Sequence, residues 1–257
     1  MMALDAPELV VDVWAASLCV GPAMRDRLEN VLLDEERARA ERFHFPRDRE
    51  RFIAGRGILR TLLGRYTSQS PQAVEIDYLA YGKPVLRGEA SLAFNVSHSG
   101  PHALYAFARG ADVQLGIDLE EIRPRPKDDW QVAEHYFAVR EVEELRRLPE
   151  DGRSAGFFTC WTRKEAFIKA RGDGLQLPLR DFEVTLAPGK PPALLRTAWS
   201  PTEPKRWRLG DLSYLVPGCA AALAVDRRRV RLVAREWSED TTNVNYQHER
   251  STDNGTD

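Results

Sequence analysis

The sequence predicts an α+β protein made of two similar α/β subdomains with a ligand cleft between them. In each half, stretches with helical periodicity come first and strands with an alternating pattern follow. Each half also has a strand of small residues beside a tight turn that contains Gly and Pro, at residues 102–108 and 219–225. This repeated order indicates one arrangement used twice. We place the subdomains at residues 1–117 and 118–236, and we expect residues 237–257 to be a disordered polar tail.

Composition narrows the class of protein. The chain has 257 residues, of which 43% are hydrophobic and 30% charged, as is ordinary for a soluble globular protein. The net charge of −2 provides no global field that would attract nucleic acid or a membrane surface. No apolar run reaches transmembrane length, and the N-terminus lacks the pattern of a signal peptide. The three cysteines lack metal or disulfide spacing, so we expect a reduced, cytoplasmic compartment.

The first half begins with an alternating stretch at residues 8–20, which predicts an edge strand. Three carboxylates then open a helix at 34–43, and a second helix follows at 47–66 after Pro46. These helices are rich in arginine. We expect most of these arginines to pair with neighbouring acids and one or two, such as Arg51, to bind phosphate.

Two short stretches after these helices contain groups suited to a ligand. In the turn Gly82-Lys83-Pro84, Gly allows close approach of the backbone and Pro holds the chain extended, although such a turn is common. The strand at 92–100 ends with Asn95, two serines and His98. An isolated histidine is usually structural, but here it stands within a cluster of donors suited to phosphate, including Ser97.

A third strand, at residues 112–120, carries two carboxylates on one face. Asp118 and Glu120 are two residues apart, which places them on the same side, roughly 7 Å apart along the strand. A solvent-facing strand end is the ordinary explanation. The alternative is a divalent cation site, because hard oxygen ligands suit Mg²⁺ and its usual phosphate partners.

The second half follows a linker at 122–126. Short helices are expected at 131–137 and 140–148, a long helix at 154–171, an extended apolar loop at 175–179, and strands at 182–186, 193–199, 207–215, 219–225 and 231–235.

The long helix has charged residues where its apolar face should be. At 100° per residue, the apolar arc contains Lys164 and Glu165, and Glu165 stacks with Trp161 and Lys169. A surface ion pair between Glu165 and Lys169 is one explanation, but it leaves Lys164 unexplained. Buried charges are costly unless they are paired or bound to a ligand, so we favour a functional role for this helix.

Four motifs occur in order along the chain: Gly82-Lys83-Pro84, Asn95-Val96-Ser97-His98-Ser99, Gly116-Ile117-Asp118-Leu119-Glu120 and Trp161-Thr162-Arg163-Lys164-Glu165-Ala166-Phe167-Ile168-Lys169. In this order and at these separations, they resemble the 4′-phosphopantetheinyl transferases, specifically the large two-subdomain class typified by the surfactin synthetase activator. The resemblance covers roughly residues 30–225. It implies a monomer with the two subdomains in a pseudo-twofold arrangement.

The resemblance also implies a reaction. The family transfers 4′-phosphopantetheine from coenzyme A to a serine hydroxyl of an apo acyl or peptidyl carrier protein, and releases adenosine 3′,5′-bisphosphate. It implies that Asp118, Glu120 and Glu165 hold Mg²⁺, for which Mn²⁺ can substitute, on the diphosphate. Glu165 is also our choice of base for the serine hydroxyl.

The remaining roles come from the same resemblance. Gly82, Lys83 and Pro84 would line the adenine, Ser97 and His98 would contact phosphate, and Lys169 would face the α-phosphate. Arg51, with Arg39 as a further choice, would bind the 3′-phosphate. This chain departs from the best-known member of the family there, with Glu36 aligned with a lysine and Phe52 with a threonine. We therefore expect Glu165, Lys169 and His98 to be catalytic, and the loop at 175–179 to dock the carrier.

Other functions fit some of the same residues. A Mg²⁺-dependent phosphohydrolase could use the carboxylates with water, and a coenzyme A or carrier-binding module could have lost activity. Asp118, Glu165 and Lys169 argue against an inactive module. Nucleic-acid binding is a weaker hypothesis, because acidic residues offset the arginines and the nearby aromatic residues follow core periodicity.

Overall fold

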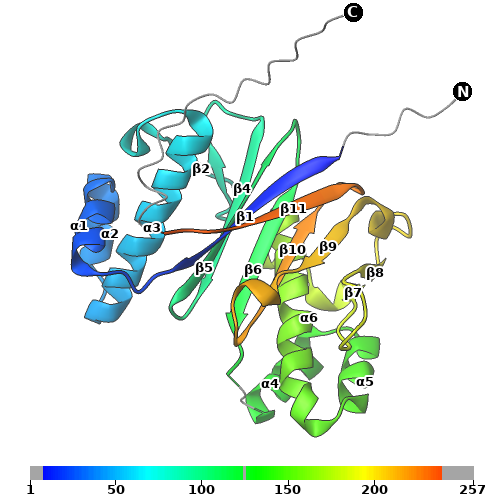
Figure 1. Cartoon of the computed structure of the whole chain (residues 1–257). Helices are drawn as coiled ribbons and strands as arrows, with labels where there is room; N and C mark the ends of the chain where they lie inside the picture. The colour runs from blue at the N-terminus through cyan, green and yellow to red at the C-terminus, as the bar shows by residue number, and fades with distance from the viewer. Residues whose placement is uncertain (1–7, 124–125, 239–257) are drawn as a thin grey trace, which may run out of the picture.

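The structure, a computed structural model, describes residues 8–123 and 126–238. Its first sheet has the strand order β11-β1-β5-β4, and its strands are β1 (Leu9–Ser17), β4 (Leu92–Ser99), β5 (His102–Arg109) and β11 (Val230–Glu236). β1 pairs antiparallel with β5 and parallel with β11, from the far end of the chain (Figure 1). The expected edge strand is therefore internal, because β11 covers its outer side. β11 also joins this first sheet, whereas the predicted division at residue 118 assigned it to the second half.

Two helices, α1 (Pro22–Asn30) and α3 (Pro46–Thr67), pack on one face of the first sheet, and α2 (Asp34–Glu41) packs on α3. The sequence predicts α2 and α3 but not the short α1. Proline begins both α1 and α3, where the missing N–H costs nothing. α1 crosses α3 at Gly57, where a β-carbon would collide with Leu28. A small hairpin, β2 (Ile76–Tyr78) and β3 (Pro84–Leu86), follows α3.

The second sheet has the order β6-β10-β9, formed by β6 (Leu115–Glu121), β9 (Arg208–Asp211) and β10 (Cys219–Val225). The long helix α6 (Glu150–Arg171) packs on one face of this sheet. Around it lie α4 (Pro126–Tyr136), α5 (Val139–Arg147) and the hairpin of β7 (Phe182–Val184) and β8 (Leu194–Thr197). The predicted strand at 207–215 is shorter because residues 213–215 form a turn of 3-10 helix.

The two sheets pack against each other through their remaining faces. The shared core contains Val11 and Leu104 from the first sheet and Ile117 and Leu223 from the second. The layers are therefore helix, sheet, sheet and helix, with α3 in one helical layer and α6 in the other (Figure 1). The predicted α+β class is confirmed. Trp237, which we assigned to the tail, is buried in the first core, and residues 239–257 lie outside the described part of the chain.

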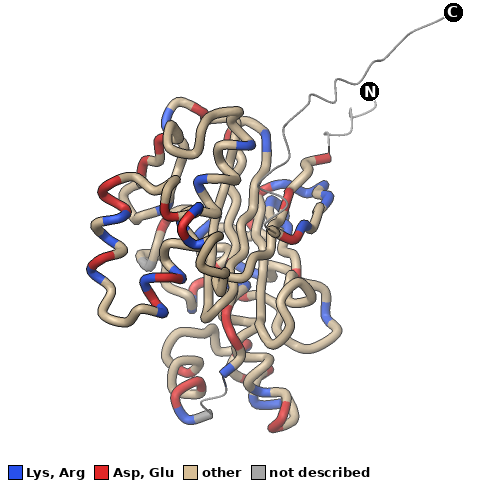
Figure 2. The backbone as a smooth tube through the Cα atoms, turned by 60° about the vertical axis from the view of Figure 1, so that its left-hand side comes forward, with Lys and Arg blue, Asp and Glu red and all other residues tan. Residues whose placement is uncertain are grey.

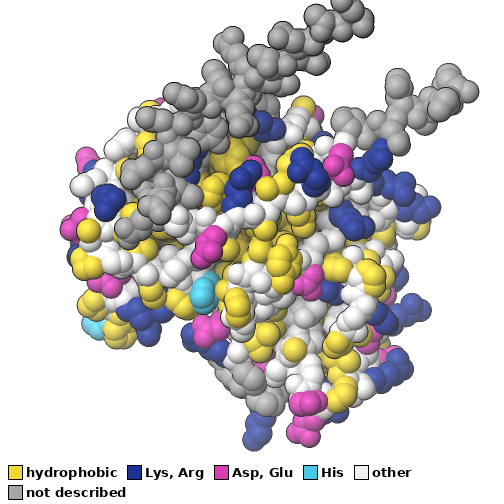
Figure 3. All heavy atoms as spheres, in the orientation of Figure 1, with side chains coloured by type: hydrophobic (Ala, Val, Ile, Leu, Met, Phe, Trp, Pro, Cys, Tyr) yellow, Lys and Arg dark blue, Asp and Glu magenta, His cyan; other side chains and the backbone are white. Residues whose placement is uncertain are grey.

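Charge is spread over the molecule. Acidic and basic residues alternate along the helices (Figure 2), and one face shows hydrophobic and charged side chains mixed together (Figure 3). Within the described residues, no helix combines the length and the apolar character needed to cross a membrane.

Candidate active site

Acidic side chains from β6 and α6 line one cavity of about 350 Å³. Asp118 and Glu120 come from alternate positions of β6, and Glu165 comes from the facing side of α6. The rest of the wall consists of Val96, Ser97 and His98 from β4 and Trp161 and Lys169 from α6. The structure thus brings together residues from both halves of the chain, and most of the predicted site residues are among them.

Gly116 explains why α6 lies so close to these carboxylates. It faces α6 from the same side of β6 as Asp118, and a β-carbon there would overlap the backbone of Ala166 and Ala170. Glycine therefore permits direct packing of the helix backbone on the strand. The consequence is that Glu165 and Lys169, one turn apart on α6, are held against β6.

Lys169 is already paired in this site. Its ammonium group lies 2.6 Å from Asp118 Oδ1 and 3.1 Å from Ser97 Oγ. The Ser97 hydroxyl also donates to Asp118 Oδ1 at 3.0 Å and accepts from the Leu119 N–H at 3.2 Å. These three contacts use the full hydrogen-bonding capacity of the hydroxyl. Ser97 therefore holds Asp118 and Lys169 in place, and a phosphate contact from this group would require one of these bonds to break.

The carboxylates repel each other in this cavity. Burial, followed by the Asp118 charge, raises the pKa of Glu165 to about 7, although Lys169 opposes the shift. Burial and Asp118 also raise the pKa of Glu120. Such shifts arise where negative charges share a partly desolvated site without enough positive charge. The site would therefore gain from a bound cation.

The donor set fits a divalent cation. Three carboxylates supply hard oxygen ligands, and Asp118 Oδ2 is buried without a hydrogen-bond partner among the described residues. Nevertheless, no three His, Cys, Asp or Glu side chains of residues 8–123 and 126–238 are yet arranged as a metal cluster. In this structure the ammonium group of Lys169 supplies the positive charge at Asp118.

A second cavity, of about 490 Å³, lies beside the first. Arg39 and Arg51, the residues predicted to bind the 3′-phosphate, line it, and His98 lines both cavities. Arg51 Nε is buried and lacks a hydrogen-bond partner in the described structure. Although the His98 ring reaches the surface, partial desolvation and the Lys169 charge lower its pKa, so the imidazole is neutral at pH 7. An anion in this cavity would meet the guanidinium groups of Arg39 and Arg51 and the neutral imidazole of His98.

Glu36 has a structural role. It is buried and forms ion pairs with Arg56 and Arg60. Arg60 also donates to the backbone carbonyls of Pro71 and Val74, at 3.0 and 3.1 Å. Two of the arginines in this region are therefore occupied by one acid. Arg56, which we did not predict to be a site residue, also lines the second cavity.

The predicted adenine-binding turn packs against the end of α6. Gly82 has a left-handed backbone with φ of 80°, as the turn requires. The ammonium group of Lys83 donates to the carbonyl of Ala170 at 2.6 Å, and Gly172 lies against its stem. Gly82, Lys83 and Pro84 lie outside both cavities described above.

Lys164 corrects our functional interpretation of the apolar arc. Its side chain is 0% exposed, and its ammonium group lies 2.8 Å from Glu141. It donates to the carbonyls of Leu179 and Phe182 at 2.8 and 2.6 Å. Glu141 in turn accepts the N–H groups of Ala138 and Val184. Lys164 therefore joins α6 to α5, to the start of β7 and to the segment before it. The charge that suggested function is structural.

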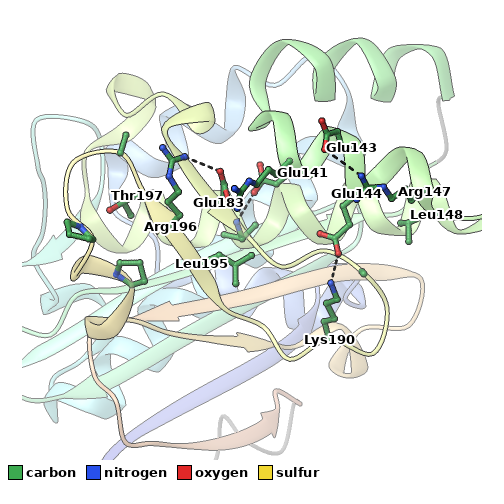
Figure 4. Close-up of a pocket in the computed structure, with 16 residues that line it drawn as sticks. Glu141, Glu143, Glu144, Arg147, Leu148, Glu183, Lys190, Leu195, Arg196 and Thr197 are labelled. Carbon is green, nitrogen blue, oxygen red and sulfur yellow. Dashed lines mark hydrogen bonds and ion pairs between the residues drawn. The ribbon is translucent and has the colours of Figure 1, made fainter.

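A larger cavity, of about 1260 Å³, lies elsewhere, between α5 and the β7–β8 hairpin (Figure 4). Its wall pairs most of its basic side chains with acids: Lys190 with Glu144, Arg196 with Glu183, and Arg147 with Glu143. Because these charges are neutralised within the wall, they offer little to a charged ligand.

The loop predicted to dock a carrier is partly helical. Short turns of 3-10 helix occupy residues 174–176 and 179–181, and Leu179 is buried in the core beside α6. Ser99, which we did not predict to be a site residue, donates a hydrogen bond from its hydroxyl to Glu120 at 3.0 Å. The sequence contains a signal for this role, because the polar residues Asn95, Ser97 and Ser99 occupy alternate positions of one strand and therefore share a face.

Comparison with known proteins gives the family. The model of the 4′-phosphopantetheinyl transferase superfamily matches residues 114–225, and that of the 4′-phosphopantetheinyl transferase N-terminal region matches residues 24–109. The chain is 42% identical over 224 residues to 4′-phosphopantetheinyl transferase HetI of Nostoc sp., covering 84% of this chain and 87% of that protein. It is 29% identical over 224 residues to 4′-phosphopantetheinyl transferase Sfp of Bacillus subtilis, covering 86% and 91% respectively. We conclude that the chain belongs to the 4′-phosphopantetheinyl transferase superfamily.

Proposed function

We propose that this chain performs its transfer with Mg²⁺ held by Asp118, Glu120 and Glu165, next to a coenzyme A site that extends past His98 to Arg51. The activity of the family is transfer of 4′-phosphopantetheine from coenzyme A to a carrier-protein serine, and this chain is such an enzyme. One observation carries the proposal: a cavity with three carboxylates and a lysine adjoins an arginine-lined cavity, and His98 lines both. Two adjoining cavities of this kind suit a ligand whose diphosphate lies, with its cation, in the carboxylate cavity and whose 3′-phosphate lies in the arginine-lined cavity.

The reaction requires charge stabilisation at the diphosphate. The serine oxygen forms a bond to the β-phosphorus, the bond to the bisphosphate oxygen breaks, and the negative charge increases on the leaving side. Bound Mg²⁺ would act as a Lewis acid that neutralises the diphosphate oxygens. Lys169, on the same wall, supplies a further positive charge to the leaving group once it is released from Asp118.

Glu165 is positioned to take the serine proton. Its carboxylate lines the cavity wall together with Asp118 and Lys169, so it can accept the proton of a serine hydroxyl that enters there. A neutral His98 can donate a hydrogen bond to a phosphate oxygen. The roles of ligand and base can coincide in Glu165, since a carboxylate has two oxygens.

The proposal also includes the oligomeric state, the cellular location and the partner of the enzyme. The cavity takes its walls from both halves of one chain, which supports action as a monomer. The three cysteines are free, which supports a reducing, cytoplasmic setting. The partner is an apo acyl or peptidyl carrier protein.

The test is intact-mass measurement of apo-carriers incubated with the enzyme, coenzyme A and Mg²⁺. Glu165→Gln keeps shape but removes charge and most basicity, so we expect kcat to fall by roughly 100-fold or more, as for loss of a general base. Lys169→Ala should also lower kcat, because the charge it stabilises is greatest in the transition state. Glu150→Gln, the same substitution at an exposed position of α6, is the matched control.

Two outcomes would contradict the proposal. One is near wild-type transfer by Glu165→Gln at saturating Mg²⁺. The other is release of the bisphosphate from coenzyme A at the same rate without a carrier, which would indicate a hydrolase. Excess Mg²⁺ should partly rescue Glu120→Gln, which loses one ligand, but not Glu165→Gln.

A further inference from the structure

The strand β4 meets β6 through side chains. No backbone ladder joins β4 to β6 in the described part of the chain, because they are the edges of different sheets. Instead, alternate side chains of β4 accept the free N–H groups of β6. Asn95 Oδ1 accepts from Ile117 at 2.8 Å, and Ser99 Oγ accepts from Glu121 at 3.0 Å. These polar side chains therefore replace the carbonyls of a neighbouring strand.

The two serines of this ladder make a second bond that the asparagine does not. Each serine hydroxyl accepts a hydrogen bond from the N–H of one β6 residue. It donates its own proton to the carboxylate of the β6 residue that precedes that N–H in the sequence. Ser97 accepts from Leu119 and donates to Asp118, and Ser99 repeats the pattern with Glu120. Because a hydroxyl has a single proton, acceptance from a fixed N–H leaves that proton for the carboxylate.

We propose that Ser99 is a positioning residue of the transferase, which holds the Glu120 carboxylate in the orientation that binds the divalent cation. The Ser99 hydroxyl donates a hydrogen bond to Oε2 of Glu120. Ser99 is itself fixed by the Glu121 N–H, so it holds the carboxylate against the backbone of the same strand. Groups that orient metal ligands in this way commonly contribute tenfold or more to metal affinity. The inference depends on the proposed cation site.

The position of Ser99 distinguishes it from Ser97. Ser97 also contacts Lys169, so its removal would disturb two charged groups together. Ser99 contacts one carboxylate and one backbone N–H, and its variants therefore report on Glu120 alone. Among the described residues, Glu120 has no ion-pair partner, whereas Asp118 pairs with Lys169.

The experiment measures Mn²⁺ binding to the substrate-free enzyme by calorimetry, together with the Mg²⁺ concentration that gives half-maximal transfer. Ser99→Ala should weaken Mn²⁺ binding by roughly tenfold and raise the required Mg²⁺ in parallel. Ser99→Thr keeps the hydroxyl and suits a strand, so it should stay within about twofold of wild type. Ser91→Ala removes a Ser–Glu hydrogen bond at the surface, to Glu89, and serves as the matched control.

The outcomes separate this inference from the proposed function. If the wild-type enzyme binds no Mn²⁺ and needs no divalent cation, the cation site and this inference both fail. If wild type binds Mn²⁺ and Ser99→Ala binds it equally well, the cation site stands and the role of Ser99 is wrong. A lower melting temperature of Ser99→Ala with unchanged Mn²⁺ affinity would likewise show a purely structural role. Weaker binding by Ser99→Ala, with recovery in Ser99→Thr, supports the inference.

Discussion

The ammonium group of Lys83 donates a 2.6 Å hydrogen bond to the carbonyl of Ala170, near the end of α6. This bond joins the Gly82 turn of the first half to the helix that carries Glu165 and Lys169. The last carbonyls of a helix lack partners within it and carry partial negative charge, which favours a cation there. The turn therefore fastens the C-terminal end of the helix from outside.

Burial gives Lys83 a measurable pH signature. It lowers the pKa of Lys83 to about 8, although nearby Asp226 opposes the shift, whereas an unfolded lysine has a pKa of about 10.4. Between these values the unfolded chain holds a proton that the folded chain has released, so the free energy of unfolding rises with pH. We expect the stability of wild type relative to Lys83→Met to be greater at pH 9.5 than at pH 7.5 in urea unfolding. Lys190→Met, at an exposed ion pair, controls for lost charge. A pH-independent difference would contradict this account.

Arg51 should discriminate between forms of coenzyme A. Its Nε is buried in the second cavity without a partner among the described residues, so an anion there would meet a guanidinium with spare donors. We expect Arg51→Ala to weaken coenzyme A by roughly tenfold or more, and 3′-dephospho-coenzyme A much less, by calorimetry. Arg49→Ala, on the same helix but paired with Glu29 at 3.3 Å, should leave both affinities unchanged. Equal losses for both ligands in Arg51→Ala would show that it does not bind the 3′-phosphate.

Lys164 should matter for stability more than for chemistry. Lys164→Met would leave Glu141 buried without its cation, and such losses cost about 3–5 kcal/mol of unfolding free energy. Urea unfolding measures this, and kcat at a temperature where the variant stays folded should remain near wild type. Adding Glu141→Gln should recover part of the loss, because the uncompensated charge is then removed. A fully stable Lys164→Met variant with lost activity would restore the functional interpretation of this lysine.

Gly116 should be intolerant of a methyl group. Gly116→Ala would place a β-carbon against the backbone of Ala166 and Ala170, which cannot move aside without separating α6 from β6. We expect a loss of about 3 kcal/mol or more of unfolding free energy, together with reduced transfer. Gly152→Ala is the control, because no described atom lies within 4 Å of the new methyl group and the residue is within α6. It should stabilise the protein by about 0.5–1 kcal/mol. A stable Gly116→Ala variant would disprove the close packing.

Periodicity in the sequence was enough to determine the local structure around the site. Alternation placed Asp118 and Glu120 on one face of a strand, because successive side chains of extended backbone point to opposite sides. Helical spacing placed Glu165 and Lys169 together on one helix for a similar reason. The four motifs, in order, were also enough to identify the family, which the matches to known proteins confirm.

Tertiary structure decided what the neighbouring charges do. Lys164 and Glu165 stand side by side in one apolar arc, and local sequence could not separate their roles. Packing separates them: Glu141 and two backbone carbonyls surround Lys164, while Asp118 and Glu120 share a cavity with Glu165. Likewise, β1 is internal because β11 arrives from the other end of the chain. The cost of a buried charge depends on partners that the fold brings from distant segments, and no local pattern specifies them.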